Sequence, residues 1–370
     1  MESEGDEASH QVSSNPSLKI LKLPPELIVE IILRLPVKSL LQYRCVSKSW
    51  RDLISSHKFI KNHVAISGNN KDCTHHRILW WEVLRCNLKN VSLSSLLYVD
   101  SVSEIIDSDY PMKYPYIPAR RHIAVQIMGS VNGLICLAIE KENFFFWNPS
   151  LRKFKNFPTA KLKLPAGSSY KLMYGFGYDE IHDDCKVVVG WKTFHSYHFE
   201  VKIYSLNNDS WRSVDDFPGG KLYMKWEFMP GLFVNGKLHS GNNIIYSCRD
   251  TCSHKIIDWD IISIDLVDGK WGKVEKPCYG EGDFTSKLGV LGGNLSMFCN
   301  YQSHADVWVM EYGIKESWTK ICVINRPKSP VMHMFIPLFF MSNKGELMFV
   351  FDSIFIIYNP KNDSSRYWLS

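Results

Sequence analysis

The feature that most constrains the fold of this chain is a pattern that recurs along its last 240 or so residues. The first half of the pattern is an apolar run, a polar turn and an aromatic residue. It occurs as FFFWNPSLRKF (144–154), VKIYSLNNDSW (201–211), ISIDLVDGKW (262–271), VWVMEYGIKESW (307–318) and IFIIYNPKNDSSRYW (354–368). The second half is a glycine turn that leads into an apolar run. It occurs as VNGLICLAI (131–139), VNGKLHS (234–240), LGGNLSMF (291–298) and SNKGELMFVF (342–351).

Short apolar runs separated by Gly, Asn, Asp and Pro are typical of strands joined by turns. The glycine turns recur at intervals of about 50 residues, with one interval about twice as long, so about six units fit the region. Four-stranded units of this length, arranged radially, make a β-propeller, and we expect one of about six blades. A pair of β-sandwiches is the alternative architecture. We expect the repeated tryptophans to lie in the core or between blades. They are Trp147, Trp211, Trp271, Trp318 and Trp368.

The segment before this region has the periodicity of helices. Pro24 and Pro25 open an apolar run in which Leu27, Ile31 and Leu35 recur every four residues, and Pro36 ends it. A second short helix should follow Pro36, and Ser47 can cap a third. So small a unit cannot bury this much apolar surface by itself, so it packs on the rest of the chain or on a partner.

The sequence LPPELIVEIILRLPVKSLLQYRCVSKSWRDLI (23–54) resembles the F-box of plant proteins. The resemblance implies binding to a Skp-family adaptor and through it to a cullin scaffold. It assigns the contacts to Leu23, Pro24, Leu27, Pro36, Val37, Leu40, Leu41, Val46, Lys48 and Trp50. Some of these side chains will belong to the core of the module instead, and for Leu27 and Leu41 both outcomes stay open.

The segments VNGLICL, FWNPSLRKF and YGFGYDEIHDDCKVV resemble the F-box-associated interaction domain, also known from F-box/kelch-repeat proteins. This resemblance implies the substrate-recognition subunit of a Skp–cullin–F-box (SCF) ubiquitin ligase, which recruits an unidentified target protein for ubiquitination and proteasomal degradation. Two alternatives stay open. One is a sensor that binds a small molecule or glycan in the β domain, and the other is a pollen–pistil receptor similar to the S-locus F-box proteins.

These patterns divide the chain into four segments. We expect a disordered acidic tail (1–17), an all-α F-box (18–63), a linker (64–77) and a β-propeller-like domain (78–370). The tail lacks the apolar core of a secretory signal and no apolar run is long enough for a membrane span, so a cytoplasmic or nuclear protein with reduced thiols is expected. The net charge of +5 is spread out, which argues against a nucleic-acid partner.

A search for catalytic motifs gives no candidate. Gly175 and Gly177 are spaced as in phosphate-binding loops, but the residues around them favour a bent strand. Cys248, Cys252 and His254 could supply three zinc ligands, but no fourth ligand stands at the usual spacing, so we expect a loop with free thiols. Asp183 and Asp184 are interpreted as solvated turn residues. We therefore expect a protein without catalytic residues, metal or cofactor.

Overall fold

The structure is a computed structural model. It describes residues 23–70, 74–82, 87–98, 105–108, 125–139, 143–158, 170–193, 199–215, 230–246, 255–278, 284–301, 303–312, 317–325, 336–351 and 354–369. The chain forms two compact units, Met1–Ser67 and Gly68–Ser370, and each is described by itself.

The first unit consists of short helices. They are α1 (Pro25–Leu33), α2 (Val37–Tyr43), α3 (Lys48–Ser55) and α4 (His57–Gly68). Pro25 occupies the first turn of α1, where a missing N–H costs nothing, and Pro36 stands at the N-cap of α2. The backbone N–H of Trp50 donates to the Ser47 hydroxyl, which confirms the predicted cap of α3. No helix in the described part of the chain is long and apolar enough to cross a membrane.

Helix α4 goes beyond the three helices that the periodicity predicts. It continues to Gly68, through residues that we expected in the linker. The imidazole of His63 stacks on Phe59 and bonds to the carbonyl oxygen of Leu35, which ties α4 to the end of α1. The core of the unit consists of Ile32, Leu33, Leu40, Ile54 and Phe59.

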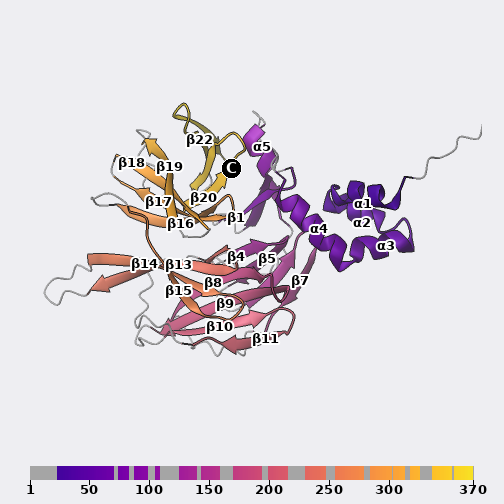
Figure 1. Cartoon of the computed structure of the whole chain (residues 1–370), viewed down its shortest axis with the longest axis horizontal. Helices are drawn as coiled ribbons and strands as arrows, with labels where there is room; N and C mark the ends of the chain where they lie inside the picture. The colour runs from indigo at the N-terminus through magenta and orange to yellow at the C-terminus, as the bar shows by residue number, and fades with distance from the viewer. Residues whose placement is uncertain are drawn as a thin grey trace, which may run out of the picture. The chain divides into compact units, whose positions relative to one another are not determined.

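The second unit is a six-bladed β-propeller, as the repeat predicts (Figure 1). Blade 1 contains β1 (Arg77–Glu82), β2 (Asn87–Ser92) and β3 (Ile106–Asp107), with helix α5 (Leu93–Tyr98) between the last two. Blade 2 contains β4 (Val125–Val131), β5 (Leu134–Ile139), β6 (Asn143–Asn148) and β7 (Lys153–Asn156). Blade 3 contains β8 (Tyr170–Asp179), β9 (Asp184–Thr193), β10 (Glu200–Ser205) and β11 (Ser210–Ser213).

The remaining blades have the same order of strands. Blade 4 contains β12 (Leu232–Val234), β13 (Lys237–Tyr246), β14 (Lys255–Asp265) and β15 (Trp271–Val274). Blade 5 contains β16 (Thr285–Leu291), β17 (Asn294–Asn300), β18 (His304–Glu311) and β19 (Ser317–Asn325). Blade 6 contains β20 (Ile336–Met341), β21 (Leu347–Phe351), β22 (Ile354–Asn359) and β23 (Ser364–Leu369). Each blade is an antiparallel sheet in which consecutive strands are neighbours.

The glycine turns of the sequence pattern connect the first and second strands of their blades. In blade 2, Val131 pairs with Leu134 around Asn132 and Gly133, and both turn residues have positive φ. Blade 4 repeats this geometry at Asn235 and Gly236. A two-residue hairpin needs positive φ at both positions, which Asn and Gly adopt at little cost.

Hydrophobic clusters join every blade to the next. Representative pairs are Leu88 with Trp147 (blades 1 and 2), Phe146 with Val189 (2 and 3), Ile203 with Ile264 (3 and 4), Ile261 with Met310 (4 and 5), Val307 with Ile356 (5 and 6) and Val91 with Ile357 (6 and 1). These clusters close the ring.

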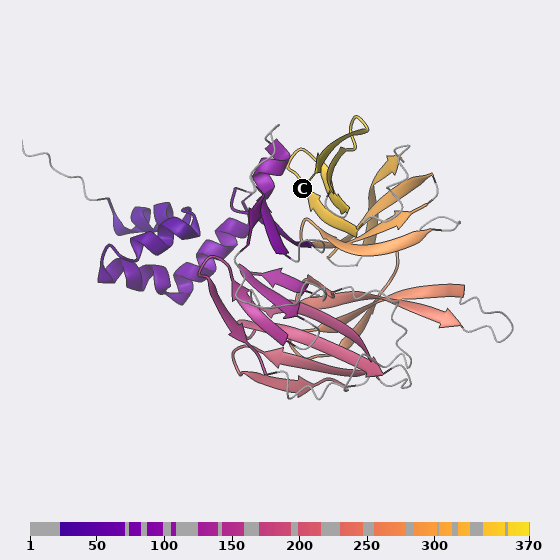
Figure 2. The ribbon, with the colours of Figure 1, turned by 180° about the vertical axis from the view of Figure 1, so that it is seen from behind.

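Among the strands that the structure describes, none is exchanged between blades 6 and 1. The described strands of each of these two blades pair only within their own sheet. The rings of Trp80 and Phe355 meet edge to face, 5.2 Å apart between centroids. Figure 2 shows the last sheet, in yellow, beside β1, in purple. The sequence predicted that the strand near Ile354–Tyr358 would lie beside an early strand near Ile78–Val83 or Val99–Ser103. The hydrophobic cluster that joins Phe355 and Ile357 of β22 to Ile78 of β1 agrees with the first of these, and residues 99–103 lie outside the described residues.

Candidate protein-binding surfaces

The predicted adaptor-binding residues divide into exposed and buried groups. Six are exposed: Leu23, Pro24, Leu27, Pro36, Val46 and Lys48. Three are half-buried: Val37, Leu41 and Trp50. Leu40 is only 5% exposed and lies in the helical core, so it supports the fold and is not free for a contact.

An exposed apolar row runs along α1, and we call it the α1 stripe. It consists of Leu23, Leu27 and Ile31, spaced four residues apart, and about half of each side chain is exposed. Leu27 and Ile31 lie one turn apart on one side of α1, Leu23 lies just before the N-cap residue Pro24, and Ile32 and Leu33 face the core. Leu27 therefore belongs to the surface. Ile31 was not among the predicted contacts, although its spacing from Leu27 would have identified it.

A second exposed apolar group lies where α2 passes into α3. Val46 is 64% exposed, and Tyr43 is also exposed. The rings of Tyr43 and Trp50 meet edge to face at 5.5 Å, and the Ser47 cap fixes the backbone of Trp50. An aromatic side chain held in this way loses little conformational entropy on binding, which is a property of interface hot spots.

In the propeller, three of the repeated tryptophans connect neighbouring blades through their indole N–H groups. Trp211 donates to the carbonyl oxygen of Pro158, Trp271 to that of Asp215 and Trp318 to that of Glu275. Each donor lies on the fourth strand of its blade, and each acceptor lies one or two residues after the fourth strand of the preceding blade. We call these contacts the tryptophan latches. They confirm the predicted packing role.

Blade 3 contains a buried ion pair whose lysine also bonds to blade 4. The Lys186 ammonium donates to the Asp179 carboxylate and to the carbonyl oxygen of Leu266 in blade 4. Burial raises the pKa of Asp179, but hydrogen bonds from Lys186 and His182 outweigh this effect and bring it down to about 2. Breaking such a pair would leave a buried charge without compensation, so these groups are structural.

The neighbouring carboxylates correct one expectation. Asp184 is buried and accepts from the backbone N–H of Asn207, while Asp183 has positive φ and accepts from the Tyr178 hydroxyl. They are turn residues, as expected, but Asp184 is not solvated. Its hydrogen bond connects the β8–β9 hairpin of blade 3 to the β10–β11 hairpin.

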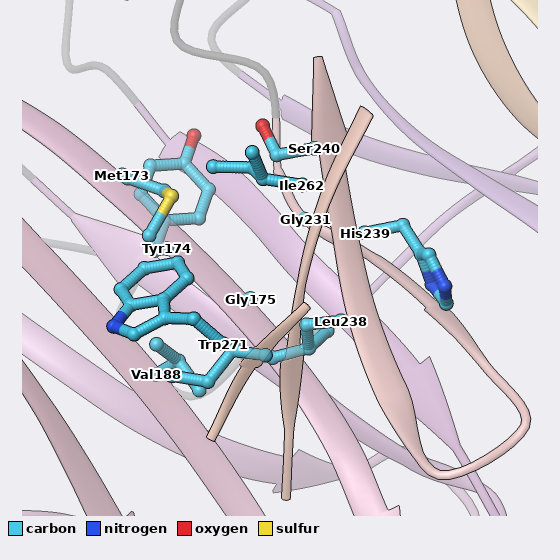
Figure 3. A pocket seen from close by; sticks show the side chains of 11 residues that line it. Met173, Tyr174, Gly175, Val188, Gly231, Leu238, His239, Ser240, Ile262 and Trp271 are labelled. Atoms are coloured by element: carbon cyan, nitrogen blue, oxygen red, sulfur yellow. The ribbon is translucent and has the colours of Figure 1, made fainter. Parts of the chain in front are cut away.

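A small cavity lies between blades 3 and 4 (Figure 3). It is lined by Met173, Tyr174, Gly175, Val188, Gly231, Leu238, His239, Ser240, Ile262, Ile264 and Trp271. Its volume of about 10 Å3 leaves room for about one water molecule, so a glycan does not fit in it. Figure 3 shows the imidazole of His239 directed away from Leu238. Burial lowers the pKa of His239 to about 4.

The described residues contain no group of three or more His, Cys, Asp and Glu side chains placed to hold a metal ion. Cys248, Cys252 and His254 lie outside the described residues. Burial raises the pKa of Cys299 to about 12 and that of Cys322 to about 11, so both thiols are protonated at neutral pH.

Gly175 and Gly177 lie within strand β8, so the prediction of a strand is confirmed, and β8 pairs with β9 without a shift in register. A Cβ at Gly175 would come within 3 Å of the Leu238 side chain, and one at Gly177 would meet Phe233. The absence of side chains at these glycines allows Leu238 and Phe233 of blade 4 to pack directly against β8 of blade 3.

Comparison with known proteins agrees with both units. The F-box domain matches residues 20–62, and the F-box associated beta propeller domain matches residues 86–368. An F-box/kelch-repeat protein of Arabidopsis thaliana is 32% identical, over 94% of this chain and 90% of its own length. F-box protein CPR1 of the same plant is 32% identical, over 88% of this chain and 79% of its own length. The chain therefore belongs to the F-box proteins that carry an F-box associated β-propeller domain.

Proposed function

We propose that this protein is the substrate-recognition subunit of an SCF ubiquitin ligase. Its F-box docks on a Skp-family adaptor, which binds the cullin scaffold, and its propeller holds the target protein. The observation that carries this proposal is the α1 stripe, because the core of the helical unit is already filled by other side chains. Exposed apolar side chains in a contiguous row mark a protein interface.

The stripe can supply the required binding energy. Burying a leucine or isoleucine side chain contributes about 1.5–3 kcal/mol, so three half-exposed side chains contribute several kcal/mol. Val46 and Trp50 supply further accessible apolar surface where α2 passes into α3. Lys48, at the start of α3, is exposed and can pair with a carboxylate at the polar rim of the interface.

The role of the chain in ubiquitination is positional. The complex brings a lysine of the target near the ubiquitin-loaded enzyme, and the rate rises through effective concentration, without a catalytic side chain from this protein. We place this activity in the cytoplasm or nucleus, and microscopy of a tagged full-length chain tests that location.

A pull-down with a purified Skp adaptor tests the docking site. Leu27→Arg should reduce adaptor binding at least tenfold, because it places a charge in the apolar interface, a loss of about 1.4 kcal/mol or more. Ile60→Arg is the matched control: Ile60 is an equally exposed isoleucine on α4, and its replacement should leave binding unchanged.

Circular dichroism should show that both variants remain helical. Leu40→Arg is unsuitable as a test because Leu40 is buried, and its loss would unfold the helices. Adaptor binding by Leu27→Arg at the level of the unchanged protein would contradict the proposed docking surface.

A further inference from the structure

Blade 2 carries a different aromatic residue at the position of the tryptophan latches. In blades 3, 4 and 5 the latch lies against the fourth strand of the preceding blade. In blade 2 the corresponding residue, near the start of the fourth strand, is Phe154 on β7. Blade 1, which precedes it, has three strands in the described part of the chain. Phe154 is accordingly 50% exposed.

The pairing of strands shows which neighbouring blade the Phe154 side chain faces. Phe154 is the cross-strand partner of Trp147, and partners in adjacent strands lie on the same face of a sheet. Trp147 belongs to the hydrophobic cluster between blades 1 and 2. Phe154 therefore lies on the face of blade 2 that is turned toward blade 1.

Blade 1 presents an exposed apolar side chain toward the same junction. Ile106 on β3 pairs with Asn90, which stands two residues after Leu88 on β2. Alternate residues of a strand share a face, and Leu88 lies in the cluster between blades 1 and 2. Ile106 is 44% exposed. Two exposed apolar side chains thus face the outer part of this junction from its two sides.

The strand that carries Phe154 and the turn before it contain three basic residues. Leu151, Arg152, Lys153 and Lys155 surround Phe154 in the sequence, and all are exposed. Among the fourth strands of the described blades, β7 is the one in which every residue is exposed. Lys155 pairs with Asp209 at 3.0 Å, whereas no carboxylate among the described residues pairs with Arg152 or Lys153. Basic charge is therefore available next to an apolar anchor.

We propose that this region binds an acidic, extended peptide segment that inserts an apolar side chain against Phe154. We call it the Phe154 flank, and it consists of Ile106, Leu151, Arg152, Lys153, Phe154 and Lys155. The apolar side chain occupies, between blades 1 and 2, the place that the latches of blades 3, 4 and 5 take at their junctions, while Asp and Glu residues of the peptide face Arg152 and Lys153. This inference rests on the proposed function, because it assigns the recognition of the target to one part of the propeller.

Fluorescence anisotropy with the full-length chain tests the proposal directly. The probe is a labelled twelve-residue peptide of alternating Glu and Asp with two central leucines. One comparison peptide replaces the leucines with serine, and another replaces the acidic residues with lysine. The first peptide should bind, binding should weaken steeply between low and physiological salt, and both comparison peptides should bind at least tenfold more weakly.

Substitutions locate the binding. Phe154→Ser should weaken binding at least tenfold, as expected for an aromatic anchor, and so should the double change Arg152→Glu with Lys153→Glu. Tyr367→Ser is the control for the first variant because Tyr367 is an exposed aromatic residue on another fourth strand, β23. Lys361→Glu is the control for charge, since Lys361 is exposed in the corresponding turn of blade 6. Both controls should bind as the unchanged chain does.

The outcomes separate this inference from the proposed function. Adaptor pull-down should be unchanged in all four variants, whereas Leu27→Arg should lose the adaptor and retain the peptide. No binding of the acidic peptide, equal binding of the lysine peptide, or binding unaffected by Phe154→Ser would overturn the assignment of the Phe154 flank. A peptide bound elsewhere on the propeller would give the last of these results.

Discussion

At the scale of single residues, the tryptophans of the repeat show what a sequence pattern can and cannot predict. The regular spacing of Trp211, Trp271 and Trp318 predicted positions in or between blades. The acceptors of their N–H groups could not be predicted, because each is a backbone carbonyl oxygen some 40–60 residues earlier. Trp368 is different: it packs at the junction of blades 6 and 1 and forms no such bond among the described residues.

Replacing a latch tryptophan with phenylalanine measures the energy of its hydrogen bond. Trp271→Phe should lower the free energy of unfolding by about 1–3 kcal/mol, because the carbonyl oxygen of Asp215 loses its donor and the ring becomes smaller. Urea denaturation measures the change. Trp368→Phe is the control for ring size, and a loss as large as that of Trp271→Phe would show that the hydrogen bond contributes nothing measurable.

At the scale of elements, strands β8 and β12 lie close because β8 contains glycine. The motif Gly175-Phe176-Gly177 predicted only a bend, since a sequence does not show which neighbour approaches a glycine. The structure places Leu238 and Phe233 of blade 4 where β8 would otherwise carry side chains.

A methyl group at this junction should therefore be costly. Gly177→Ala should lower the free energy of unfolding by about 1–3 kcal/mol through overpacking against Phe233. Gly231→Ala is a matched control at the same junction, because its Cβ would have no atom nearer than 3.5 Å. Thermal unfolding of both variants measures the difference, and equal stability of the two would refute this account of Gly177.

The helical unit marks a second limit of prediction at this scale. Helices α1 to α3 follow from proline positions, the Ser47 cap and apolar spacing. Helix α4 was missed because Phe59 is its one buried residue among the described side chains, so its sequence carries little helical periodicity. The placement of Leu40 in the core could not be settled, because core and interface side chains are equally apolar in a module of this size.

At the scale of the whole molecule, the number of blades followed from the period of the repeat. Blade 1 was the least predictable, since it carries neither half of the repeat and interrupts its strands with helix α5. Its contact with blade 6 depends on side chains. Arg366 of β23 bonds to the carbonyl oxygen of Leu97 in α5 and pairs with Glu346 at 2.9 Å.

Removing the contact between Trp80 and Phe355 should destabilise blade 1 more than the other blades. Phe355→Ala should cost about 3–5 kcal/mol of stability and increase hydrogen exchange in β1 and β2. Phe298→Ala removes the same ring from the junction of blades 5 and 6, so it should cost a similar amount without selective exchange in blade 1. Uniform exchange throughout the propeller in Phe355→Ala would contradict this role of the closure.

The absence of strand exchange among the described strands of blades 1 and 6 has a topological consequence. Each of these two sheets is formed by one continuous stretch of chain, so the start and the end of the propeller meet at an ordinary blade junction. The chain termini could therefore be moved to another junction. A circularly permuted chain that joins blade 6 to blade 1 and opens between two other blades would keep every described β-ladder intact.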